Sequence, residues 1–200
     1  MAAKPALRPG VGETTLGDYG LLTEIQKDSI GPLWVGRRTG ESDARTLVLI
    51  RPVAVDQLPG GIAEEMEGAA SWAQQLEHEA LLPVTAVVSD DDRLGIVSQY
   101  VEGEVLSVLL FRANVRRQHF PVAVVLRIVL DLLEGLAFLH EQEAPSDAYR
   151  FGTLSPENVY IGLDGRARIL EPGVTAVLDQ ADDWGGGCQA VGLSRARATR

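Results

Sequence analysis

The side chains that most often carry out protein chemistry are sparse in this chain. It contains one cysteine, Cys188, and three scattered histidines, so it can form neither an intramolecular disulfide nor a zinc-ligand set. Acidic residues outnumber basic ones by 28 to 18, which gives a formal net charge of −10. This balance argues against nucleic-acid binding, because a phosphate backbone is bound by clustered cations. We expect the arginines at 195, 197 and 200 to belong to a solvated tail.

The sequence also lacks the features of a membrane or secreted protein. Residues 1–17 contain prolines and glycines without an apolar run, which predicts a flexible leader and no secretory signal. The most apolar stretch, residues 122–139, is interrupted by Arg127, Asp131 and Glu134, which is unfavourable for a membrane span. We therefore expect a soluble, cytoplasmic protein with no membrane partner.

The first half of the chain has the apolar pattern of strands around one helix. The helix is expected from Glu64 to Leu76, where apolar residues recur at helical spacing after the break at 59–61. Short apolar runs bounded by turn residues predict strands at 21–25, 33–35, 47–50, 84–88 and 94–97.

The second half has mainly helical periodicity. Helices are expected at 105–111 and 122–140, followed by a hairpin of strands 159–161 and 167–170 with its turn at 163–165. In the longer helix, the three charged residues lie four and three positions apart, so they share one narrow stripe. We expect that helix to be buried on several sides. No periodic element is expected after residue 179.

Three segments, which occur along the chain in the same order as in protein kinases, resemble motifs of that family. Residues 154–161, LSPENVYI, are similar to the catalytic loop H-R-D-L-K-P-E-N and the strand after it. Residues 97–103 are similar to the kinase hinge, and residues 48–51, VLIR, to the strand motif V-A-I-K. The resemblance covers roughly residues 18–174, at kinase-like spacing. An unrelated α+β domain is the minor alternative.

The resemblance implies an α+β, protein-kinase-like fold. A small lobe of five strands and one helix is expected at 18–98 and a hinge at 99–103. A partial, mainly helical large lobe is expected at 104–178, and a flexible tail at 179–200.

The resemblance also locates the catalytic positions, and several lack the family's residue. Thr153 occupies the position of the catalytic base and Ser155 that of the loop lysine. A threonine hydroxyl cannot accept a proton near neutral pH, and losing a general base costs about 10²- to 10⁴-fold in rate. Asn158 and Glu171 occupy the metal-ligand positions, although an asparagine is equally suited to satisfying loop amides. Pro172 replaces the phenylalanine of D-F-G.

The phosphate-holding lysine is replaced by Arg51, which keeps the charge but is larger and planar. Counting back from His78 puts Ala69 at the position of its acidic partner. Two alternatives follow for Arg51 besides a ligand role. It extends to solvent, or it pairs with Glu65 or Glu67 after a shift in helix register.

The nucleotide cleft is degenerate in the same way. Of the three glycines of the phosphate loop only Gly31 is present, beside Gln26 and Asp28, and its turn with Pro32 explains it equally well. Leu49 replaces the small residue that faces the adenine ring. We therefore expect no cofactor, with ATP and Mg²⁺ as the alternative. The candidate cleft residues are Gly31, Leu33, Leu49, Arg51, Ser98 and Tyr100.

No counterpart of the kinase A-P-E motif or of the large-lobe hydrophobic helix follows residue 174. Helix 122–139 would then lack part of its cover, which predicts a protein partner or self-association through its exposed face. The sequence thus predicts a pseudokinase-type binding module without phosphoryl transfer. The alternatives are a Ser/Thr kinase with atypical active-site residues and a truncated gene product without independent function.

Overall fold

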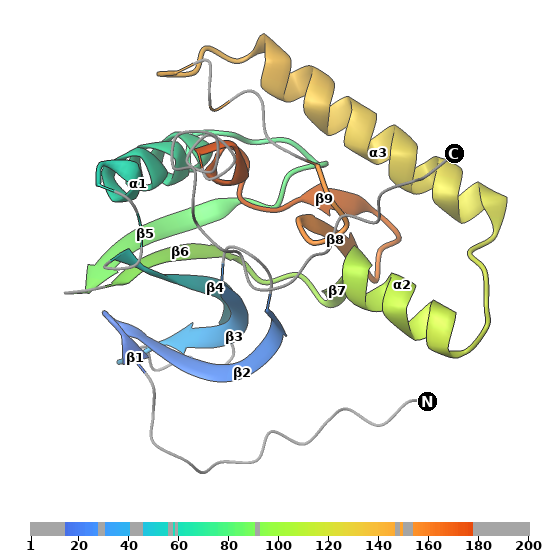
Figure 1. The fold of residues 1–200 in the computed structure, drawn as a ribbon, viewed down its shortest axis with the longest axis horizontal. Coiled ribbons are helices and arrows are strands. Elements are labelled where there is room, and N and C mark those ends of the chain that lie inside the picture. The colour runs from blue at the N-terminus through green and yellow to red at the C-terminus, as the bar shows by residue number, and fades with distance from the viewer. Residues whose placement is uncertain are drawn as a thin grey trace, which may run out of the picture.

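The computed structural model describes residues 15–27, 31–40, 46–55, 58, 60–90, 93–146, 149 and 154–177. A curled antiparallel sheet carries one helix, and a small second sheet with two more helices lies beside it (Figure 1). Residues 1–14, 28–30, 151–153 and 178–200 lie outside the described part. Most of the predicted leader, the predicted tail and the position of the catalytic base are therefore not described.

The larger sheet has the order β1-β2-β3-β4-β6-β5, with every neighbouring pair antiparallel. Some of its apolar side chains pack with helix α1 in the main core, and the others belong to two smaller clusters. The α+β class predicted from the sequence is therefore confirmed. The elements of this half are β1 (Thr15–Leu16), β2 (Tyr19–Lys27), β3 (Pro32–Arg38), β4 (Leu47–Ala54), α1 (Ile62–Ala73), β5 (Val84–Asp90) and β6 (Arg93–Gln99).

The prediction of five strands was one strand short. Strand β1 lies within the expected leader, and its Leu16 is completely buried. The reason is a close approach to Gly95 on β6, where an added Cβ would overlap the Leu16 side chain. A two-residue strand next to a glycine-rich segment has no periodicity of its own, so the sequence pattern could not indicate it.

The second sheet, β7-β8-β9, is joined to the first by residues 100–102. Its hairpin turn was predicted correctly at 163–165, where Gly165 adopts a φ of 80°. Strand β7 was missed, since it is three residues long. The elements of this half are β7 (Gly103–Val105), α2 (Leu106–Val115), α3 (Val122–Glu141), β8 (Val159–Gly162) and β9 (Ala167–Ile169).

Asp164 in this turn is expected to titrate with a pKa of about 2, below its ordinary value of 3.8. The Arg168 guanidinium contributes most, with hydrogen bonds of 2.6 and 3.2 Å, and the Arg166 backbone N–H donates a third. A lowered pKa stabilises the fold above pH 3.8, and that contribution is lost as the pH falls toward 2. An NMR titration of the carboxyl group measures it. Arg168→Ala should return the pKa toward 3.8, and an unchanged value would contradict the assigned cause.

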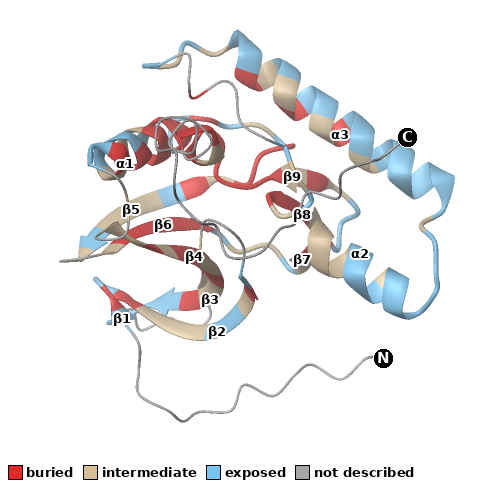
Figure 2. Ribbon diagram, viewed as in Figure 1, coloured by how far each residue is buried: buried red, intermediate tan, exposed pale blue. Residues whose placement is uncertain are grey.

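Helix α3 buries one charged residue and leaves much of its apolar surface exposed, which differs from the expectation based on its composition. Its buried residues are Asp131, Gly135 and Leu139, so part of the polar stripe faces the protein. The Asp131 carboxylate accepts a hydrogen bond from the Ala167 backbone N–H at 3.0 Å and pairs with Arg127. The prediction of burial on several sides was wrong, because only the side of α3 that carries Asp131, Gly135 and Leu139 packs against other described residues. The apolar faces of α3 are consequently exposed (Figure 2).

None of the helices in the described ranges is both long enough and apolar enough to cross a membrane.

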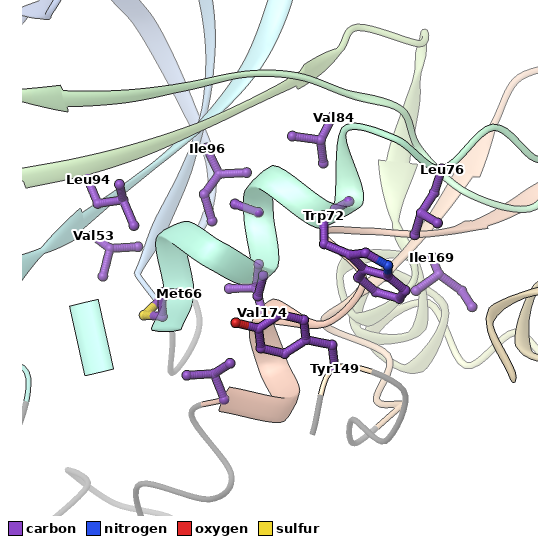
Figure 3. Packing of buried hydrophobic residues seen from close by; sticks show 14 of the residues in the cluster. Val53, Met66, Trp72, Leu76, Val84, Leu94, Ile96, Tyr149, Ile169 and Val174 are labelled. Atoms are coloured by element: carbon purple, nitrogen blue, oxygen red, sulfur yellow. The ribbon is translucent and has the colours of Figure 1, made fainter. Parts of the chain in front are cut away.

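The main core lies between α1, the larger sheet and the chain after β9 (Figure 3). Trp72 of α1 packs against Tyr149 with ring centroids 6.0 Å apart, and its indole N–H donates to the Glu143 carbonyl at 3.1 Å. The Tyr149 hydroxyl donates to the Glu65 carbonyl at 3.2 Å. These contacts attach the segment that follows α3 to the small-lobe helix, so the two halves share one core.

Candidate functional site

The candidate site lies between the two sheets and is centred on a buried ion pair. Arg51 projects from β4 and Glu171 follows β9, and the Arg51 Nε lies 2.5 Å from the Glu171 Oε2. Their side chains are 0 % and 2 % exposed, so the pair is removed from water. Two charges at this depth stabilise a structure only when each has the other as a partner. The pair therefore couples the larger sheet directly to the segment after β9.

This contact corrects both structural alternatives considered for Arg51. The side chain does not extend to solvent, and Glu65 and Glu67 are themselves exposed on α1. Helix α1 instead presents Ala69, which is completely buried. Because that position offers no carboxylate, the cation is compensated by Glu171 from the other side of the cleft.

The backbone turns after Glu171, and the residues that follow pack against helix α1. Glu171 has a φ of 47°, a left-handed conformation that is unusual for a residue other than glycine. The backbone then turns, and the Val174 N–H donates to the Glu171 carbonyl at 3.2 Å. Val174 and Val177 are completely buried in the cluster that includes α1 (Figure 3). Glu171 is thus held by packing on both sides of the turn.

The phosphate-loop positions also make contacts across or within the cleft. The Gln26 side-chain amide donates to the Glu157 carbonyl at 3.2 Å, which joins β2 to the loop before β8. Gly31 has a φ of 146°, and its carbonyl accepts a hydrogen bond from Arg51 Nη1 at 3.0 Å. A Cβ at Gly31 would lie 3.0 Å from the Pro52 carbonyl, so the glycine has a local steric reason. Asp28 lies outside the described residues.

The two positions that the kinase resemblance places beside the adenine ring, Leu33 and Leu49, lie among apolar side chains. Leu33 and Leu49 of the larger sheet pack in one cluster with Tyr160 and Leu170 of the other half. Each of these four side chains is about 1 % exposed. A side chain of Leu49's size could be predicted to reduce the space for a base, but the contribution of Tyr160 was missed. The only available signal was a large aromatic residue two positions after Asn158.

Tyr160 also binds the segment that joins the sheets. Its hydroxyl donates a hydrogen bond to the Val101 carbonyl at 2.9 Å. Burial raises the pKa of the Tyr160 hydroxyl well above its ordinary value of 10, with smaller contributions from Tyr100, Glu104 and Glu102. The neutral hydroxyl is therefore a stable donor, and the connection between the sheets is fixed by it.

The remaining cleft positions are close to this cluster. Tyr100 packs against it, and burial together with Glu102 raises the pKa of its hydroxyl. Ser98 pairs with Leu49 across the strands, and its hydroxyl is buried without a hydrogen-bond partner within the described part of the chain. A small polar side chain here leaves Leu49 room to point toward the cluster.

The two metal-ligand positions have structural partners. The Asn158 Oδ1 accepts a hydrogen bond from the Ser155 backbone N–H at 2.8 Å, and the Glu171 carboxylate binds Arg51. The Ser155 hydroxyl accepts from the Glu157 N–H at 3.3 Å. Thr153 lies outside the described residues. Within the described ranges, no group of three or more His, Cys, Asp or Glu side chains is placed to hold a metal ion.

These features define a class of domain: two sheets with a helix on the first, a short connection and a loop-plus-hairpin, with side chains of the two halves packed between the sheets. No protein-family model matches the chain. It is similar to the tyrosine-protein kinase MasK of Myxococcus xanthus, at 25% identity over 163 residues, 79% of this chain and 25% of MasK. The serine/threonine-protein kinase srb10 of Schizosaccharomyces pombe is 19% identical over 162 residues, 78% of this chain and 42% of srb10.

A plant kinase gives the longest of these three alignments. CBL-interacting protein kinase 4 of Oryza sativa is 24% identical over 185 residues, which is 92% of this chain and 39% of that protein. The fold and these similarities together identify the chain as protein-kinase-like. The chain spans less than half the length of each of the three kinases.

Proposed function

We propose that this chain is a pseudokinase-type regulatory module that acts by binding protein and does not transfer phosphate. The observation that carries the proposal is the buried Arg51–Glu171 pair. It joins, by one hydrogen-bonded contact, the residue at the phosphate-binding position and the residue at a metal-ligand position. Phosphoryl transfer needs both groups to be directed at the nucleotide and its metal, since catalysis there is mostly positioning and charge neutralisation.

Three further contacts support a closed cleft. Gln26 joins β2 to the loop at Glu157, Tyr160 binds the connection at Val101, and Leu49 packs in the same cluster as Tyr160. A nucleotide would have to separate all of these groups before its base and phosphates could enter. That separation costs free energy, which lowers the affinity for nucleotide.

We expect ATP at millimolar concentration, with or without Mg²⁺, to leave the melting temperature of the protein unchanged. A ligand present at 100 times its Kd would stabilise the folded state by about 2.7 kcal/mol, which a thermal-shift titration detects readily. An active protein kinase measured in the same buffers verifies the assay.

A saturable rise with ATP would contradict the proposal and support the alternative of a kinase with atypical residues. Arg51→Lys then shows whether the phosphates contact this position, because lysine keeps the charge but loses the planar fork. A change in ATP affinity in that variant would locate the nucleotide beside β4.

The binding role is supported by the exposed apolar surface of α3. Seven large aliphatic side chains on this helix are 42–74 % exposed. Soluble proteins usually expose such residues singly, whereas these seven lie close together on one helix. A contiguous surface of this kind is typical of a protein interface. Its members are Val122, Val124, Val125, Leu126, Val129, Leu130 and Leu133.

A further inference from the structure

The exposed side chains of α3 follow the spacing of a helix-pairing seam. Val122, Leu126, Val129 and Leu133 are separated by four, three and four residues, and each is between 45 % and 74 % exposed. This alternation is the spacing with which one helix packs lengthwise on another. Leu136 continues it but packs partly on the main core, so the free seam covers about three turns of the helix.

Charges are segregated along the same surface. Residues 106–130 contain four arginines and no acidic residue, whereas residues 131–143 contain four acidic residues and no lysine or arginine. Arg127 and Asp131 bind each other, and Arg112 binds Glu104 at 2.9 Å.

The charges that remain lie at the two ends of the seam. Arg116 and Arg117 are exposed at the end of α2, six and five residues before Val122, and Glu134, Glu141 and Glu143 are exposed after Leu133. None of these five side chains forms an ion pair with another described residue. The seam is therefore preceded along the chain by basic residues and followed by acidic ones that are unpaired within the described ranges.

We propose that α3 pairs antiparallel with α3 of a second copy of this chain, with Val129 near the two-fold axis. This proposal rests on the proposed binding function and names its partner. In this arrangement Leu126 lies beside Leu133 of the second copy. The basic end of each copy then meets the acidic end of the other, so one twofold contact satisfies both the apolar seam and the charges.

A parallel arrangement would have the opposite electrostatics. It would bring Arg116 and Arg117 of the two copies together at one end and the glutamates together at the other. Like charges across an interface oppose association, so the charge pattern selects the antiparallel pair.

Sedimentation of the full chain over a concentration series tests the pairing. We expect a monomer–dimer equilibrium in which Val129→Glu raises the dimer Kd by about a hundredfold or more, because two carboxylates would be buried together on the axis. Val129 is 45 % exposed in the single chain, so the substitution should leave the melting temperature nearly unchanged. The matched control is Leu163→Glu, at an exposed apolar residue of the β8–β9 turn, which should leave the Kd unchanged.

A charge exchange tests the direction of pairing. Reversing Arg116 and Arg117 to glutamate, or Glu141 and Glu143 to arginine, should each raise the Kd by about tenfold, and combining the four changes should restore it. Failure to restore the Kd would overturn the antiparallel arrangement. A wild-type chain that stays monomeric, or a dimer insensitive to Val129→Glu, would overturn the second copy as the partner. Either result leaves the cleft proposal standing, because that proposal is tested by ATP binding and by the cleft variants and does not depend on the oligomeric state.

Discussion

Replacing Arg51 with methionine is expected to lower the free energy of unfolding by about 3–5 kcal/mol, and Glu171→Leu should have a similar effect. Each single change leaves one charge buried without the partner that now lies 2.5 Å away. The double variant removes both charges and should recover most of the lost stability, because apolar residues of similar volume can replace a buried pair. Urea denaturation of the four proteins gives the double-mutant cycle.

The exposed pair Arg38–Asp18 is the matched control within the same sheet. Its charged atoms are 3.9 Å apart and its side chains are 53 % and 76 % exposed. Arg38→Met should therefore change the stability by less than about 1 kcal/mol. If Arg51→Met proves equally mild, Arg51 and Glu171 are not paired in solution, and the proposed closure of the cleft loses its main support.

The length of each helix or strand explains how much of the fold the sequence could predict. Strands and helices were located correctly where an apolar period extends over several residues, as in β6, α1 and α3. Elements of two or three residues, β1 and β7, were missed because they contain too few positions for a period. Their stability comes from neighbours, as with Leu16 against Gly95.

The candidate site was predictable as a set of positions but not as a set of contacts. The resemblance to protein kinases pointed to Arg51, Asn158 and Glu171 as members of one site. The partner of Arg51 lies 120 residues away and belongs to the opposite half, so local spacing could not select it over Glu65. The same limit applies to the Gln26–Glu157 hydrogen bond, whose groups are 131 residues apart.

The sequence predicted that helix 122–139 has an exposed face, but not which face it is. Composition alone suggests that its apolar circumference is buried and its charged stripe exposed. The structure reverses part of this, since Asp131 receives the Ala167 N–H and thereby orders β9. The Asp131 hydrogen bond and the packing of Gly135 and Leu139 together decide which face of this hydrophobic helix is left exposed.

Replacing Tyr160 with alanine is expected to lower the free energy of unfolding by about 3–5 kcal/mol, as for other large buried aromatic residues. The side chain is about 1 % exposed and packs in the cluster that joins Leu33 and Leu49 to the second sheet. Loss of the Tyr160 side chain both leaves a cavity in this cluster and removes the hydrogen bond to the Val101 carbonyl. Equilibrium unfolding in urea measures the change.

Tyr160→Phe separates the two contributions, because it keeps the ring and removes only the hydroxyl. We expect a cost of about 1 kcal/mol at neutral pH, the usual value of one hydrogen bond. The raised pKa of Tyr160 adds a pH signature. The neutral Tyr160 hydroxyl contributes fully to the free energy of unfolding below pH 10, and this contribution is lost as the pH rises toward the folded-state pKa. The phenylalanine variant has no hydroxyl to ionise, so it should lose less stability in alkali than the wild type. If Tyr160→Ala costs no more than Tyr160→Phe, the ring does not fill the cleft, and space for a nucleotide base is present after all.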